Sequence, residues 1–147
     1  MHVTQTARYA LHVMMRLASM PKGAQARARD LSKATNVPPA YLSKIMRRLV
    51  RKGLLRARKG HGGGFVLARR AQSIRLEDVL VAAGGSLEPD VCIFGNGRCD
   101  AADPCPLHDS WSELNLAFHA WSRRTTLASL APLPSRRRRR RHPVRRK

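Results

Sequence analysis

The segment from residue 39 to residue 52 constrains the fold of this 147-residue chain more than any other. Apolar residues recur there every three or four positions, which predicts an amphipathic helix from Pro39 to about Lys52, with a proline in its first turn and Gly53 after its end. The apolar positions are Leu42, Ile45, Met46, Leu49 and Val50, and the opposite face carries Ser43, Lys44, Arg47, Arg48 and Arg51. One face is therefore expected to pack, and the other to present positive charge.

The residues before this helix complete a recognisable arrangement. A short helix is predicted around Asp30–Thr35, and the turn Asn36-Val37-Pro38 follows it directly. A short helix, a tight turn and a second helix with a basic outer face make a helix-turn-helix, whose second helix enters the DNA major groove. Taken alone, the basic residues could equally form an ordinary solvent-exposed helix face with no DNA contact.

The basic helix is followed directly by the sequence LLRARKGHGGGFVLAR, which makes an ordinary solvated face the less favoured interpretation. It predicts a β-hairpin, with strands at 55–58 and 65–68 and a glycine-rich tip between them. Such a hairpin is a wing, and its tip can approach phosphates closely because glycine has no side chain. The wing residues expected to contact DNA are Arg58, Lys59, His61, Gly62 and Gly63. A nucleotide-binding P-loop is the weaker interpretation, because no Gly-Lys-Ser/Thr closes the motif and a strand follows it.

Two further amphipathic segments complete the first domain. Residues 3–20 predict a helix of about four turns, and residues 76–83 predict a short helix that Gly84-Gly85 ends. The expected fold is mainly α with a small β-hairpin wing. It comprises a winged helix-turn-helix domain over residues 1–85, plus a long C-terminal dimerisation helix over residues 107–130.

The dimerisation helix is inferred from large apolar residues at steps of four, three, four and three. These residues are Leu107, Trp111, Leu114, Phe118 and Trp121. This spacing is that of an a/d seam, which pairs with another helix. We expect a homodimer whose two basic helices lie about 34 Å apart on a palindromic double-stranded DNA operator. The alternative is that this helix packs on its own domain.

Residues 86–106 form a loop that holds every cysteine of the chain, followed closely by a histidine. Cys92, Cys99, Cys105 and His108 are the candidate metal ligands. Three thiolates and an imidazole suit either a zinc ion or an iron-sulfur cluster, and the wide spacing favours the cluster without deciding the choice. Uncoordinated thiols are the third possibility.

The distribution of charge narrows the class of partner. Residues 1–75 hold seventeen Lys and Arg but only one acidic residue. Residues 76–130 hold three Lys and Arg and eight acidic residues, and residues 131–147 hold nine Lys and Arg and no acidic residue. Such a basic surface indicates that the partner is a nucleic acid, and we expect neither membrane binding nor a small-molecule substrate. No nucleophile-base pair suggests an enzyme, and no signal peptide is apparent, so a cytoplasmic protein is expected. A further alternative is an iron-sulfur carrier or assembly partner.

The chain resembles the Rrf2 family of bacterial winged-helix regulators, in its iron-sulfur cluster regulator branch and more distantly in its nitric-oxide-sensing branch. TQTARYAL, LSKATNVPPAYLSKIMRRLVRKGLL, RKGHGGGFVLAR, SIRLEDVL and the three-cysteine loop occur in the family's order. The resemblance implies a homodimeric DNA-binding transcription regulator with a 2Fe-2S or 4Fe-4S cluster that reports iron-sulfur status, redox stress or nitric oxide. It also implies that Cys92, Cys99, Cys105 and His108 are the cluster ligands.

Three departures from the family pattern matter. The Cys92–Cys99 interval is one residue longer than in the cluster regulator branch. Arg8 stands where some members supply an acidic cluster ligand. Arginine cannot ligate a metal, so His108 becomes the main candidate for the fourth ligand, and His12 is a weaker one. The Arg-rich segment 131–147 has no family counterpart, and we expect it to be a disordered tail that adds non-specific phosphate affinity.

Overall fold

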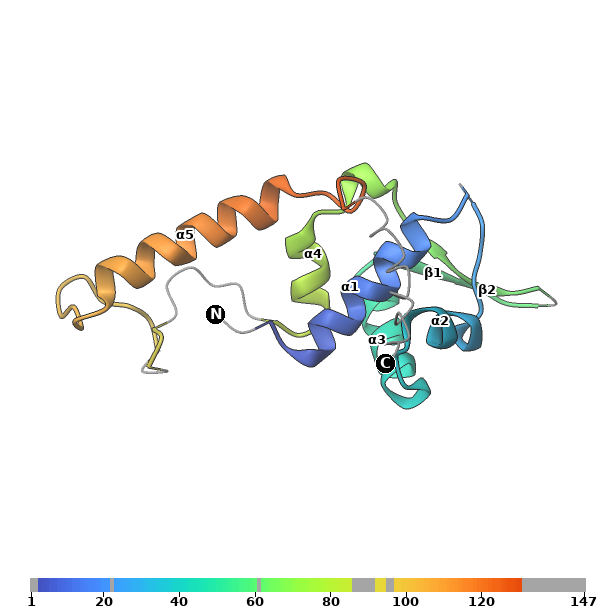
Figure 1. The fold of residues 1–147 in the computed structure, drawn as a ribbon, viewed down its shortest axis with the longest axis horizontal. Coiled ribbons are helices and arrows are strands. Elements are labelled where there is room, and N and C mark those ends of the chain that lie inside the picture. The colour runs from blue at the N-terminus through green and yellow to red at the C-terminus, as the bar shows by residue number, and fades with distance from the viewer. Residues whose placement is uncertain (1–2, 22, 61, 86–91, 95–96, 131–147) are drawn as a thin grey trace, which may run out of the picture.

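In the computed structural model, helices α1 to α4 and a two-stranded hairpin form a head, and α5 extends away from it (Figure 1). The structure describes residues 3–21, 23–60, 62–85, 92–94 and 97–130. The elements are α1 (Gln5–Ala18), α2 (Ala28–Thr35), α3 (Pro39–Arg51), β1 (Leu55–Arg58), β2 (Gly64–Leu67), the 3₁₀ turn η1 (Ala71–Ser73), α4 (Leu76–Ala82) and α5 (His108–Arg124). The predicted mainly helical fold with a hairpin wing is confirmed.

The core of the head lies where α1 packs against α2, α3 and α4. Thr4 caps the start of α1, and its hydroxyl oxygen accepts a hydrogen bond from the Ala7 N–H at 3.2 Å. The apolar stripe that predicted α3 is the stripe that the structure buries. The largest fully buried side chains are Val13, Met14, Leu31, Val37, Leu42, Ile45, Met46, Leu49, Leu54, Leu55, Ile74 and Leu127.

The turn between α2 and α3 is fixed by local hydrogen bonds. Asn36 ends α2 in the left-handed conformation at φ 56°, which asparagine tolerates better than most residues. The Ser32 hydroxyl donates to the Val37 carbonyl at 2.6 Å, and the Val37 side chain is buried. Pro39 then starts α3, so the predicted helix-turn-helix is present, with α2 two residues longer at its start than expected.

The wing is anchored by a contact that the sequence pattern did not predict. β1 and β2 pair antiparallel, with Leu55 opposite Leu67. Beside β2, the Ala26 N–H donates to the Phe65 carbonyl at 3.1 Å, and the Phe65 N–H donates to the Ala26 carbonyl at 2.9 Å. A Cβ at Gly64 would lie 2.6 Å from the Ala26 carbonyl oxygen, so this close approach requires glycine. The segment before α2 therefore acts as a third, one-residue strand of the wing.

The C-terminal helix is shorter than predicted, because the chain returns to the head after Arg124. Thr125 is extended, and its carbonyl accepts a hydrogen bond from the Leu76 N–H at 2.9 Å. The Leu127 N–H donates to the Ile74 carbonyl at 2.8 Å, and the Leu127 side chain is 2% exposed within the core. The expected helix over 107–130 is thus a helix over 108–124, followed by a segment that belongs to the head.

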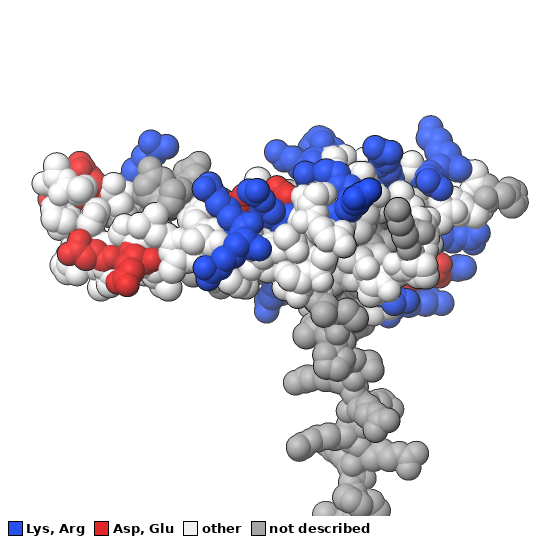
Figure 2. Space-filling model, turned by 90° about the horizontal axis from the view of Figure 1, so that it is seen from above, with Lys and Arg blue, Asp and Glu red and all other residues white. Residues whose placement is uncertain are grey.

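Charge is separated along the molecule. Figure 2 shows most Lys and Arg over the head and the adjoining end of α5; much of the visible Asp and Glu lies at the opposite end, and other acids lie among the cations of the head. Exposed acids at that opposite end include Asp100, Asp103, Asp109 and Glu113. The residues expected to form the Arg-rich tail, 131–147, lie outside the described part of the chain, as do residues 86–91 of the expected loop.

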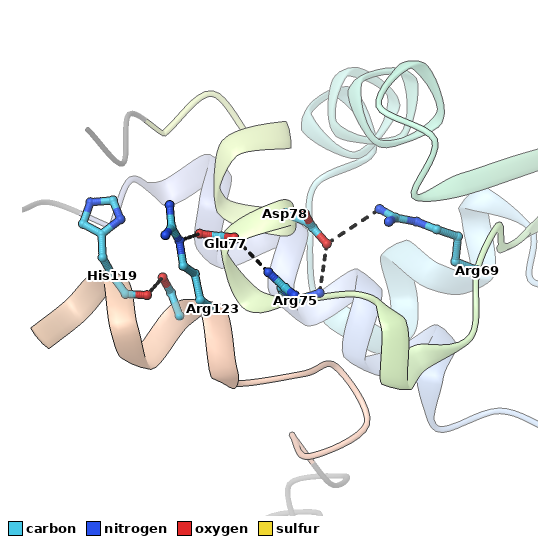
Figure 3. Close-up of polar contacts among 7 residues, drawn as sticks. Arg69, Arg75, Glu77, Asp78, His119 and Arg123 are labelled. Atoms are coloured by element: carbon cyan, nitrogen blue, oxygen red, sulfur yellow. Dashed lines mark hydrogen bonds and ion pairs between the residues drawn. The ribbon is translucent and has the colours of Figure 1, made fainter. Parts of the chain in front are cut away.

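A group of ion pairs surrounds the start of α4 (Figure 3). Glu77 pairs with Arg123 of α5 at 3.1 Å and with Arg75 at 3.8 Å. Asp78 pairs with Arg69 at 3.7 Å and accepts a hydrogen bond from the Arg75 N–H at 3.0 Å. Exposed pairs contribute roughly 0–1 kcal/mol each, and of these only the Glu77–Arg123 pair joins α4 to α5, so they do little to hold α5 in place.

None of the described helices is both long enough and apolar enough to cross a bilayer.

Leu127→Ala should reduce the free energy of unfolding by about 2–5 kcal/mol, because it leaves a cavity where α5 meets the head. Leu130→Ala, at a half-buried position three residues later, should cost clearly less. Denaturant titration at one fixed protein concentration measures both. Equal losses for the two variants would contradict the inferred role of Leu127.

Candidate DNA-binding surface and cysteine segment

The outer face of α3 presents unpaired positive charge. Ser43, Lys44, Arg47 and Arg51 are exposed, and no ion pair within the described part of the chain involves the three cations. The Ser43 hydroxyl donates back to the Pro39 carbonyl at 3.1 Å and keeps its oxygen lone pairs available. The face can therefore offer mobile cations to phosphates or to base edges.

A groove of about 440 Å³ runs between α3 and the wing. Its apolar lining comes from Met46 and Val50 of α3 and from Phe65 of β2, and Arg47 and Arg51 also line it. The hairpin that the sequence predicted after α3 thus stands beside the basic face of this helix. A duplex lying on α3 would meet both elements together.

The wing tip is held by the segment before α2. The Gln25 side-chain amide donates to the Gly62 carbonyl, so that carbonyl is engaged within the protein. A Cβ at Gly63 would collide with the Arg58 carbonyl oxygen, so the fold itself favours glycine here, apart from any contact with DNA. Arg58 and Lys59 are exposed, whereas His61 lies outside the described residues.

Sequence reasoning missed the cations of the first helix of the motif. Arg27, Arg29 and Lys33 are exposed at the start and along the outer side of α2. Arg29 and Lys33 are four residues apart and therefore share a helix face, which was a usable signal. They extend the positive surface beyond α3.

Arg48 is placed differently from the other predicted DNA contacts. Its guanidinium Nη1 donates to the Ala83 carbonyl oxygen, 2.9 Å away at the end of α4. It therefore links two helices of the head instead of lining the groove beside Arg47 and Arg51.

The cysteines lie at the end of α5 that is distant from the head (Figure 1). All three are partly buried and none forms a disulfide. The Cys92 N–H donates to the Gly97 carbonyl at 2.9 Å, and the His108 N–H donates to the Cys105 carbonyl at 2.9 Å. Local hydrogen bonds therefore shape the segment at both ends, and His108 is the first residue of α5.

The donor chemistry fits a metal group, but the side chains do not converge in this structure. Three thiols and an imidazole within seventeen residues are the ligand types of zinc and iron-sulfur sites. Among the described residues, however, no three His, Cys, Asp or Glu side chains come together as a metal site. Arg8 is exposed and its guanidinium donates to the Gln5 side chain, and His12 is also exposed on α1.

The predicted dimer seam on α5 is partly exposed. Leu107, Leu114 and Trp121 are 42%, 50% and 43% exposed, and Leu116, which lies outside the seam on the opposite side of the helix, is 59% exposed. Phe118 packs against the core and meets the Trp121 ring at 5.5 Å between centroids. The side of α5 that is buried carries polar residues instead, namely Asn115, His119 and Ser122. The helix therefore rests on its own head through one side and leaves an apolar strip open on another.

Comparison with known proteins gives one consistent answer. The model of the Rrf2 family, described as iron-dependent transcriptional regulators, matches residues 3–132. The HTH-type transcriptional regulator IscR of Escherichia coli is 29% identical over 130 residues, which cover 88% of this chain and 80% of that protein.

Solved structures share the fold. The structure of CymR, the global cysteine regulator of B. subtilis, superposes with a TM-score of 0.76 at 21% identity, covering 89% of this chain and 96% of CymR. That of T. potens IscR gives a TM-score of 0.71 at 20% identity, covering 88% and 85% of the two chains.

Arg47→Ala should weaken binding to duplex DNA and reduce the slope of log affinity against log salt concentration by about 1, as expected when one phosphate contact is lost. Arg124→Ala removes another exposed arginine, at the end of α5, and should leave the slope unchanged. Fluorescence anisotropy at several salt concentrations measures both slopes. An unchanged slope for Arg47→Ala would contradict the placement of DNA on α3.

Proposed function

Because this chain belongs to the Rrf2 family of transcriptional regulators, we propose a specific form of that function: a homodimer that binds a palindromic operator and senses through its cysteine segment. The chain is a DNA-binding transcription regulator and not an enzyme. The signal that we propose is iron-sulfur status, redox stress or nitric oxide, read through an iron-sulfur cluster.

The exposed cationic face of α3 beside the wing carries the DNA-binding part of the proposal. Lys44, Arg47 and Arg51 have no acidic partner in the described part of the chain, so no ion pair must break before they contact phosphate. Phosphate contacts fix the position of the protein on the duplex, while base contacts from the same helix would give specificity. The groove and the wing limit how α3 can enter a major groove.

The open apolar strip on α5 supports the dimer. Leu107, which precedes α5, and Leu114 and Trp121 within this 17-residue helix are large side chains left in contact with water. Exposed apolar strips of this kind mark protein interfaces, and a second copy of the same helix is the simplest cover. A two-fold axis through α5 would hold two α3 helices at fixed spacing, which is why we propose a palindromic operator.

The cysteine segment supports the sensor. Cys92, Cys99 and Cys105 would be the thiolate ligands, and His108 would be the fourth, since Arg8 is a cation turned toward Gln5. A cluster held there would supply a group that oxidants or nitric oxide can destroy. Because the ligands do not converge in this structure, binding would have to draw the segment into a different shape. A zinc site remains the second candidate, since the same donors suit it.

Wild-type protein purified without oxygen should be brown and contain iron and sulfide. Cys99→Ala should lose the colour, because a thiolate ligand is removed, whereas Asp103→Asn, an exposed position of the same segment, should keep it. Absorption spectra with iron, sulfide and zinc analysis measure this. Colourless protein with stoichiometric zinc would replace the cluster with a structural zinc ion.

Leu114→Glu should shift the protein from dimer to monomer, because it places a charge in the proposed seam. Ala120→Glu adds the same charge on the side of α5 opposite the seam, where Ala120 is exposed, and should leave the dimer intact. Analytical ultracentrifugation distinguishes the two states. A wild-type monomer, or equal effects of both variants, would count against a dimer formed through α5.

A further inference from the structure

Arg48 occupies the basic stretch of α3 but acts on another helix. Its Nη1 lies 2.9 Å from the Ala83 carbonyl oxygen, and this hydrogen bond is partly buried. Arg47, the preceding residue, lines the groove beside the wing instead. Two adjacent arginines of one helix thus point to different surfaces.

The contact lies at the end of α4, where backbone carbonyls lack helical partners. The Gly84 N–H donates to the Val81 carbonyl at 3.0 Å, and the Gly85 N–H donates to the Leu80 carbonyl at 3.0 Å, which is the Schellman pattern of a helix end. The Ala83 carbonyl is left over, and Arg48 satisfies it with a cation at the negative end of the helix dipole.

Glycine is favoured at position 84 by its backbone, because its φ is +89°, in the left-handed region that side chains disfavour. A Cβ there would also lie 2.9 Å from the Arg48 Nη1 and would crowd the end of that side chain. The helix end and the arginine contact therefore lie next to each other.

The chain leaves for the cysteines immediately after this contact. Cys92 is seven residues beyond Gly85, a span of at most about 25 Å when fully extended. At its other end, α4 is bonded to the segment after α5 through the Leu76 N–H and the Thr125 carbonyl at 2.9 Å, and to α5 itself through the ion pair of Glu77 with Arg123. A change in the cysteine segment can therefore act on α4 from both ends, and Arg48 connects α4 to α3.

We propose that Arg48 is a positioning residue that transmits the state of the cysteine segment to α3, and that it does not contact DNA. This inference rests on the proposed function, because it assigns a regulatory role within the same DNA-binding surface. Arg48 acts through its hydrogen bond to Ala83, so it sets where α3 lies without touching the operator.

The test is a double-mutant cycle. The protein is reconstituted with iron and sulfide under anaerobic conditions, and the DNA is a duplex that the wild-type protein selects from a random library. Cys99→Ala alone should change the affinity for this duplex at least about fivefold, the lower range of allosteric coupling. In an Arg48→Ala background the same change should fall below about twofold, because the coupling between the two sites is lost. In an Arg47→Ala background the full effect of Cys99→Ala should remain.

Two further measurements separate positioning from DNA contact and from general destabilisation. Arg48→Ala should leave the salt slope of binding unchanged, whereas Arg47→Ala lowers it by about 1. Arg48→Lys, which keeps a donor for the Ala83 carbonyl, should restore the response to Cys99→Ala. Gly84→Ala, which keeps Arg48 but displaces its Nη1, should abolish that response.

Several results would overturn the proposal. A reduced salt slope for Arg48→Ala would make Arg48 a phosphate contact, and an undiminished Cys99→Ala effect in that background would remove its coupling role. No effect of Cys99→Ala on wild-type affinity would show that the cysteine segment does not reach α3, while DNA binding itself stands. Failure of the wild type to bind any duplex would instead refute the proposed function, and the inference would fall with it.

Discussion

Backbone pairing between the residues that precede α4 and the residues that follow α5 holds the two parts of the molecule in one arrangement. The Ile74 carbonyl and the Leu76 N–H bond to Leu127 and Thr125, and the Leu127 side chain enters the core of the head. Without this pairing α5 would touch the head only through its own side chains, including the buried side with Ser122 and the Glu77–Arg123 ion pair. The orientation of the apolar strip on α5, and with it the spacing of the two α3 helices in the proposed dimer, therefore depends on these few residues.

The wing is positioned by an equally small contact. The pairing of Ala26 with Phe65 joins the hairpin to the segment that leads into α2, so the wing and the helix-turn-helix are parts of one hydrogen-bonded unit. Gly64 makes this possible because no side chain separates the two backbones. The groove beside α3 consequently has a fixed wall, which a hairpin attached only at its base would not provide.

Periodicity in the sequence was enough to predict the helices, the turn at Asn36 and the hairpin, since each is a local pattern of apolar, glycine and proline residues. It could not predict the Ala26–Phe65 contact, which is a single pair between distant segments. Nor could it predict that α5 ends at Arg124, because Leu127 joins the core through tertiary packing. The direction of the Arg48 side chain is likewise not encoded in helix spacing, which places a residue on a face but does not select its hydrogen-bond acceptor.

The separation of charge along the molecule affects events before any contact with DNA. In the described part of the chain most cations lie on the head, whereas Asp100, Asp103, Asp109 and Glu113 are exposed toward the remote end of α5, and such a separation gives this part an electric dipole. In the electric field of the DNA phosphates, such a dipole experiences a torque that turns the head toward the duplex during diffusion. The distance over which this torque acts becomes shorter as added salt reduces the Debye length. Encounters in which the head faces the duplex are thereby enriched over random ones, and the acidic end of α5 is turned away from the phosphates.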